Sequence, residues 1–172
     1  MTRLLFLALL ANIFLTGCAL GPMPQNAKEF REGMKGGGFG INVEEYVVKH
    51  PYSKVSKILA AKTKECLYVE RTESACNNYG CTYTDITYNP KVTRGEKRTE
   101  LLVQVERDPD NAWYISGKPP KGGPIVALVD LVPAGTSKTK VNVYSPSMAY
   151  TAIAKAVKHW TNGTNLGCPT FE

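Results

Sequence analysis

Five short segments of strand-like sequence follow one another between residues 66 and 144, and they limit the possible folds more than any other feature. They are residues 66–72, 82–88, 100–106, 125–132 and 139–144. In the third of them, Leu101, Val103 and Val105 alternate with other residues and therefore point to one face of a strand. Turn-forming residues such as Pro133-Ala134-Gly135-Thr136 separate neighbouring segments. Short connections favour antiparallel pairing, so this region predicts an antiparallel sheet.

One more strand and two helices complete the predicted domain. Residues 41–49 suit a strand, and Pro51 suits the first turn of a helix that continues to about Thr63. A last helix is predicted from about residue 147 to 162, where Gly163 ends it. Its apolar stripe consists of Ala149, Ile153, Ala156, Val157 and Trp160. We therefore predict a single α+β domain over residues 41–172, with a curved antiparallel sheet of about six strands packed against both helices.

The order of strand, helix, five strands and helix resembles the helix-grip family, in which a curved antiparallel sheet wraps a long C-terminal helix. The resemblance covers about residues 41 to 163 and lies in the order of the elements, without a diagnostic motif. The family includes lipid-binding proteins and the accessory lipoprotein of the outer-membrane barrel-assembly machine. Many of its members have two helices between the first two strands. The single helix here argues against a large internal ligand cavity.

Residues 1–17 have the pattern of a secretory signal peptide. Arg3 precedes an apolar run from Leu4 to Leu15 that only Asn12 interrupts, and small residues follow. The run has about twelve residues, whereas a helix that spans a bilayer needs about twenty. Removal of the signal would leave 172 − 17 = 155 residues, enough for one domain with a substantial core.

Leu15-Thr16-Gly17-Cys18 resembles the lipobox of bacterial lipoproteins. The resemblance implies that the Cys18 thiol carries fatty acids such as palmitate and that the signal is cut before it. An ordinary cleaved signal is the alternative. In a Gram-negative host, Ala19 after the cysteine implies sorting to the outer membrane. We therefore expect a lipid-anchored protein of the cell envelope that faces the periplasm.

Residues 18–40 predict a flexible tether between the lipid and the domain. The segment contains Pro22 and Pro24, a short polar helix at about Ala27 to Met34, and the glycine-rich run 36–40. A phosphate-binding glycine loop is the sharper alternative. Such a loop should open a helix, whereas a strand is predicted after these glycines.

Four cysteines remain after Cys18, and an exported domain with an even number of cysteines predicts two disulfides, with three possible pairings. Cys76 and Cys81 flank the turn-prone sequence Asn77-Asn78-Tyr79-Gly80, which favours a bond between them at a hairpin tip. Cys66 and Cys168 then pair by elimination. A zinc site is the alternative, but the spacing of the cysteines and the two scattered histidines do not suit one.

No motif for catalysis stands out. His50 and His159 are the two histidines of the chain, and each is interpreted as a structural residue at a helix start or on a helix flank. Asp130 interrupts an apolar strand; it could line a pocket, but an outward-facing position is favoured. The other carboxylates considered form no recognisable pair: Glu65, Glu70, Glu73 and Asp85. We predict a protein that is not an enzyme, with no cofactor other than the lipid on Cys18.

Two features could contact a partner. Residues 116–124 cannot form regular structure, and loops of this kind often carry contacts, here through Lys118, Pro119, Pro120, Lys121 and the nearby Tyr114; a plain connector is the alternative. The second feature is a possible row of exposed aromatic side chains in or near the sheet: Tyr79, Tyr83, Tyr88, Tyr114 and Tyr144.

The predicted function is an interaction or assembly module that the lipid holds at the membrane and that contacts another envelope protein. The mature chain has a charge of +6 − 1 = +5, which serves solubility or attracts anionic headgroups or glycans. No nucleic-acid motif is present, so nucleic acid is not an expected partner. Two alternatives are a carrier or sensor of an apolar ligand between the sheet and the C-terminal helix, and a hydrolase with an unrecognised site.

Overall fold

The structure is a computed structural model that describes residues 22–36, 41–108, 118–146, 150–164 and 167–171. One six-stranded antiparallel sheet has the order β1-β6-β5-β4-β3-β2. Its strands are β1 (Asn42–Val48), β2 (Val69–Asn77), β3 (Gly80–Arg94), β4 (Thr99–Arg107), β5 (Ile125–Pro133) and β6 (Thr139–Ser145). The described helices are α2 (Ala27–Lys35), α3 (Tyr52–Cys66) and α4 (Thr151–Thr161). The predicted α+β fold with a curved sheet and a C-terminal helix is confirmed.

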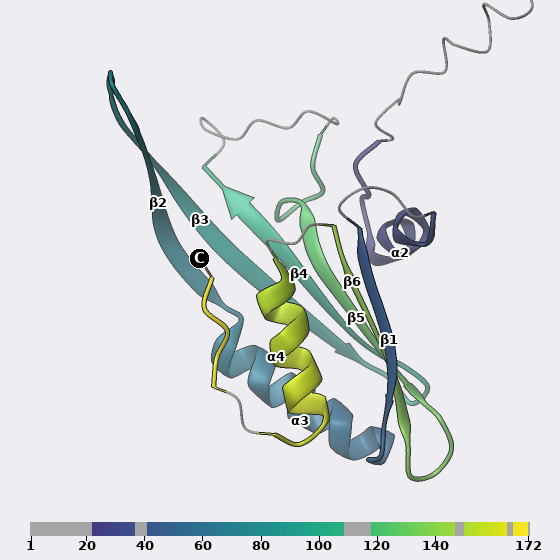
Figure 1. The fold of residues 1–172 in the computed structure, drawn as a ribbon. Helices are drawn as coiled ribbons and strands as arrows, with labels where there is room; N and C mark the ends of the chain where they lie inside the picture. The colour runs from purple at the N-terminus through teal and green to yellow at the C-terminus, as the bar shows by residue number, and fades with distance from the viewer. Residues whose placement is uncertain (1–21, 37–40, 109–117, 147–149, 165–166, 172) are drawn as a thin grey trace, which may run out of the picture.

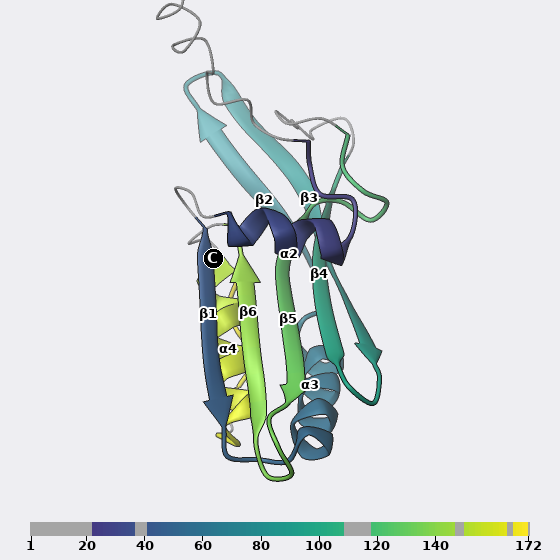
Figure 2. The same cartoon turned by 90° about the vertical axis from the view of Figure 1, so that its right-hand side faces the viewer.

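The helices lie on both faces of the sheet. Helices α3 and α4 cover one face, and α2 crosses the strands on the other (Figures 1 and 2). Strand β5 is sandwiched between these layers and is buried along seven consecutive residues, Ile125–Leu131. This explains its nearly continuous apolar sequence, because a strand covered on both faces does not alternate apolar and polar residues.

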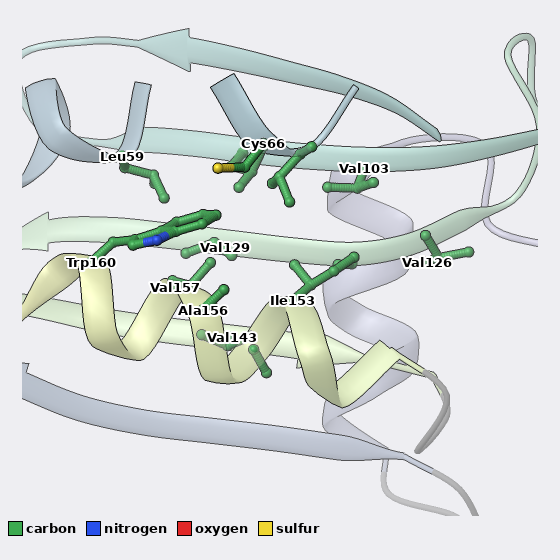
Figure 3. Packing of buried hydrophobic residues seen from close by; sticks show 14 of the residues in the cluster. Leu59, Cys66, Val103, Val126, Val129, Val143, Ile153, Ala156, Val157 and Trp160 are labelled. Atoms are coloured by element: carbon green, nitrogen blue, oxygen red, sulfur yellow. The ribbon is translucent and has the colours of Figure 1, made fainter. Parts of the chain in front are cut away.

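The main core lies between the sheet and the helices α3 and α4. Trp160 of α4 is 1% exposed and lies beside Leu59 of α3, above Val129 of β5 (Figure 3). Ile153 and Val157 of α4 are fully buried in the same layer. The spacing of these residues on α4 therefore places one apolar stripe on the sheet, as the sequence predicts.

Two element boundaries differ from the predictions. Cys66 was predicted to begin a strand, but it ends α3, where it is buried and bonded to Cys168. Strand β3 continues to Arg94 instead of ending at Tyr88. Its Pro90 pairs with Val103 of β4, while the pairing with β2 stops at Tyr88. With a neighbour on one side only, this part of β3 can accept a residue that lacks a backbone N–H. The predicted start of the last helix, 147–149, lies outside the described residues.

The predicted tether over residues 18–40 contains a packed helix. Phe30 and Met34 of α2 are buried against Ile125, Leu128 and Tyr144 on the second face of the sheet. Residues 27–35 therefore belong to the folded domain and are not a free linker, because the helix has an apolar side that the sheet covers. The predicted lipid site Cys18, the predicted signal 1–17 and residues 37–40 lie outside the described residues.

No helix among the described residues has the length and apolar character needed to cross a lipid bilayer.

Candidate functional site

The ends of β2 and β3 extend past the rest of the sheet (Figure 1). Strand β4 pairs with β3 only from Ile86 onward, so residues 80–85 have β2 as their only strand partner. We call residues 72–85 the hairpin arm. Every side chain from Ser74 to Tyr83 is exposed. The arm thus offers both of its faces to solvent.

The arm is closed by a disulfide and a tight turn. Cys76 and Cys81 are bonded, as the turn sequence predicts, and Asn77 Oδ1 accepts a hydrogen bond of 2.8 Å from the Tyr79 N–H. Gly80 has φ of +140°, which favours glycine. At this tip Tyr79 is 99% exposed, and Tyr83 nearby is 65% exposed. The covalent loop therefore holds Tyr79 out in solvent, and Tyr83 is exposed two residues after the disulfide.

The second predicted disulfide, Cys66–Cys168, is also confirmed, and it ties the end of α3 to the C-terminal segment. Glu65 lies within 4.8 Å of both sulfur atoms, the one cluster of potential metal ligands among the described residues. Because both sulfurs are bonded to each other, neither is a thiolate that could bind a metal ion. The zinc alternative for the four cysteines is therefore wrong.

The predicted contact loop is anchored to the sheet through its backbone. Gln104 Nε2 donates hydrogen bonds of 2.9 Å to the carbonyls of Lys121 and Gly123. A Cβ atom at Gly123 would lie 1.9 Å from the Val105 carbonyl oxygen, so only glycine allows this approach. Lys118 and Lys121 remain exposed, whereas Pro120 is buried. Tyr114 lies outside the described residues.

Asp130 does not face solvent, contrary to its favoured interpretation. Its side chain is covered by α2, where Arg31 donates hydrogen bonds of 2.7 and 3.0 Å to its two oxygens. The same guanidinium donates a bond of 2.7 Å to Glu100. The bonds to Asp130 raise the pKa of Arg31 above its ordinary value. Asp130 thus lies on the face of the sheet opposite the main core, and it is buried because α2 covers that face and supplies Arg31 as its partner. The alternation of residues in β5 alone does not predict this cover.

Next to this cluster, α2 and the loop at 118–123 enclose a hollow of about 510 Å³ on the second face of the sheet. Its cationic lining comes from Lys28 and Arg31 of α2, Lys91 of β3 and Lys121 of the loop. Glu100 is its one acidic lining residue. We call this the basic hollow. The predicted contact residues Pro120 and Lys121 thus line a site that the sequence did not suggest, since its other residues come from distant segments.

A second hollow of about 610 Å³ adjoins the basic hollow, with which it shares Gln25, Pro120 and Lys121. Lys118, Pro119 and Arg107 also line it. All four predicted contact residues of the loop therefore lie along these two hollows.

The two histidines have no hydrogen-bonded partner for their imidazoles among the described residues, although both lie near the end of α4. His50 Nε2 lies near Gly163, and the His159 carbonyl accepts a bond from the Thr164 N–H. In the part of the chain that the structure describes, neither imidazole is paired with a nucleophile or a carboxylate.

The predicted aromatic row is divided between the surface and the interior. Tyr88 and Tyr144 are each 5% exposed, whereas Tyr79 and Tyr83 are exposed on the arm. Tyr88 packs against Phe171, with ring centroids 4.4 Å apart. Among the described residues, the exposed tyrosines of this row therefore lie at the arm, while Tyr68, just before β2, is a further exposed aromatic at 57%.

The space between the sheet and α4 is occupied by the side chains of the main core, including Trp160, Leu59, Ile153 and Val157. A ligand at this place would have to displace them.

No family model matches the chain, and no curated protein does. Among solved structures, the chain is similar to a conserved protein from Geobacillus kaustophilus. The two share 16% sequence identity, and the match covers 72% of this chain and 90% of the other, with a TM-score of 0.34. At this level the likeness carries no argument about function.

Proposed function

We propose that this protein is a lipid-anchored module of the cell envelope that contacts another envelope protein through the hairpin arm. The observation that carries the proposal is the projection of Tyr79 and Tyr83 on a two-stranded, disulfide-closed tip. Tyrosine is enriched at the centres of protein interfaces, because one side chain supplies a large contact area and a hydroxyl group. The sequence Asn77-Asn78-Tyr79-Gly80 adds polar groups without charge, which cost less to desolvate than charged groups and can hydrogen-bond to a partner.

The disulfide between Cys76 and Cys81 would preorganise the tip of the arm for binding. A two-stranded hairpin is marginally stable in water. A covalent bond between Cys76 and Cys81 restricts the unbound tip and so lowers the entropy lost on binding.

The lipid anchor is supported by the signal and the lipobox-like sequence before Cys18. Metabolic labelling with a fatty-acid probe should mark the protein, and Cys18→Ser should abolish both the label and its recovery in the membrane fraction. An unmarked parent protein, or a Cys18→Ser protein still held at the membrane, would contradict the anchor.

Site-specific photo-crosslinking in intact cells tests the arm. A photoreactive amino acid at Asn78 should give a discrete adduct with one envelope protein, and Tyr79→Ser in the same chain should reduce it at least fivefold. The matched control carries the photoreactive residue at Lys57, an exposed position on α3. Equal adducts from Asn78 and Lys57, or an adduct that does not depend on Tyr79, would reject the arm as the contact surface.

A further inference from the structure

We propose that the basic hollow binds the phosphate of an anionic phospholipid headgroup, which would orient the domain on the membrane that carries its anchor. This inference rests on the proposed lipid anchor for its choice of phosphate source. It adds a binding site on the face of the sheet that lies under α2, away from the main core (Figure 2).

The charge of the basic hollow is the first argument. Lys28, Lys91 and Lys121 converge from a helix, a strand and a loop. Among the residues that the structure describes, no carboxylate lies within ion-pair distance of any of the three. The nearby acids, Glu100 and Asp130, are instead held by Arg31. The lining therefore has a surplus of three amines whose charge no carboxylate of the described residues neutralises by an ion pair.

Amines with this arrangement suit phosphate, which accepts hydrogen bonds through several oxygens at once. Thr93 adds a hydroxyl group to the lining, while Leu102 and Ile125 add apolar surface. The volume of about 510 Å³ falls in the range of ordinary ligand sites. A headgroup with its glycerol backbone offers both the anionic and the less polar parts that this lining can contact.

The position of the hollow relative to the anchor selects a membrane lipid over a soluble anion. Gln25 lines the hollow and follows Cys18 by seven residues. Seven residues span at most about 25 Å. With Cys18 acylated in the bilayer, the hollow cannot move farther than this from the membrane surface, where anionic headgroups are concentrated.

The adjoining hollow adds further positive charge to the same side of the domain. Lys118 and Arg107 extend the positive lining beyond Lys121, and Glu106 is the one acidic residue among the described residues that line this second hollow. The two hollows thus form one continuous basic surface on this side of the domain. An anionic surface that meets this side would interact with several of these cations together.

Vesicle binding by the mature chain tests the proposal without the anchor. The chain carries Cys18→Ser behind a cleavable signal that has no lipobox, so that no acyl chain can dominate the result. We expect at least tenfold tighter binding to vesicles of phosphatidylcholine with 30% phosphatidylglycerol than to pure phosphatidylcholine at low salt. Lys28→Gln, Lys91→Gln and Lys121→Gln should each weaken binding about fivefold, the factor expected for one basic residue at an anionic surface.

The matched controls are Lys54→Gln and Lys57→Gln, which remove the same charge from exposed positions on α3, across the sheet. They should leave binding within twofold of the parent. Equal losses from both sets would mean a net-charge effect and would overturn the site, as would binding without preference for phosphatidylglycerol.

Inorganic phosphate and glycerol 1-phosphate separate the possible sources of phosphate. Neither should compete with the vesicles at 1 mM, at constant ionic strength. Full competition by either would overturn the assignment to a membrane lipid. Failure of the anchor would appear in fatty-acid labelling, whereas failure of the hollow would appear only in this vesicle assay, so the two are distinguishable.

Discussion

Asp130 shows how much one residue can depend on a segment far away in the sequence. Among the described residues it is the only charged side chain that is fully buried, at 1% exposure. Its partner Arg31 is 99 residues earlier and lies 13% exposed on α2. A buried charge is tolerated only when it is paired and hydrogen-bonded. This pair therefore couples the register of β5 to the placement of α2.

Arg31→Met should destabilise the fold by about 3 kcal/mol or more, because it leaves the Asp130 carboxylate buried without its close partner. Arg98, at 3.9 Å, is mostly exposed and cannot replace both hydrogen bonds. Urea unfolding measures the loss. Arg31→Met with Asp130→Leu should recover most of it, since the charge is then removed. Lys62→Met, which breaks an exposed pair with Glu65, is the control and should cost less than 1 kcal/mol. A similar loss from the control and from Arg31→Met would contradict the role of burial.

Tyr46 makes the free energy of unfolding depend on pH in the alkaline range. Burial raises the pKa of its phenol to about 12, while its hydroxyl lies 3.3 Å from Thr161 Oγ1. The folded-state pKa exceeds the unfolded value of about 10, so the contribution of Tyr46 is complete below pH 10 and is lost as the pH rises toward 12. Tyr46→Phe should therefore lose less stability between pH 8 and pH 11 than the parent, measured by urea unfolding. A parallel loss in both proteins would show that the Tyr46 phenol is not the group that titrates.

At the scale of elements, the two disulfides have different roles. Cys66–Cys168 closes a loop with a sequence separation of 102, whereas Cys76–Cys81 closes one with a separation of 5. The short bond lies in an arm whose strands have only each other as neighbours. Its effect should be local, and that of the long bond should reach the main core.

Paired serine substitutions should separate these roles. Cys66→Ser with Cys168→Ser should cost about 4 to 5 kcal/mol in global unfolding, and Cys76→Ser with Cys81→Ser about 2 kcal/mol at most. The second pair should also speed amide hydrogen exchange in residues 72–85 while exchange in β5 stays unchanged. Each pair serves as the control for the other. Faster exchange in β5 without the short disulfide would contradict a local role.

The arrangement of the elements was largely predictable, and their exact ends were not. The alternation in β4 and the apolar stripe of α4 identify elements from sequence, because side chains repeat with the geometry of a strand or a helix. The continuation of β3 through Pro90 depends on where β2 stops pairing. The end of α3 at Cys66 depends on packing and on a disulfide partner near the C-terminus. Such long-range neighbours have no local signature.

On the scale of the whole molecule, α2 gives the sheet a second covered face. Phe30 is 2% exposed and, with Met34, covers Ile125, Leu128 and Tyr144. Without this helix, apolar side chains on the two strands β5 and β6 would face solvent, and surfaces of this kind favour association. The position of α2 also forms one wall of the basic hollow.

Phe30→Ala should release α2 from the sheet, since truncation of a buried phenylalanine costs about 3 to 5 kcal/mol. The main core on the other face should remain folded. We expect faster hydrogen exchange in residues 27–35 and concentration-dependent association in light scattering. Glu32→Ala, at an exposed position of the same helix, should do neither. A monomeric Phe30→Ala protein with unchanged exchange in α2 would contradict the role of α2 as a cover.

Local periodicity and short turns in the sequence were enough to predict the class of fold, the order of its elements and the bond between Cys76 and Cys81. The bond between Cys66 and Cys168 followed only by elimination, because it joins residues 102 positions apart. The sequence also carries the prediction of a signal and a lipidated Cys18. The packing of α2 on the sheet, the burial of Asp130 beside Arg31 and the shared hollow of Lys28, Lys91 and Lys121 became visible only in the folded chain. These features join residues separated by tens of positions, and their contact depends on how the chain crosses the sheet.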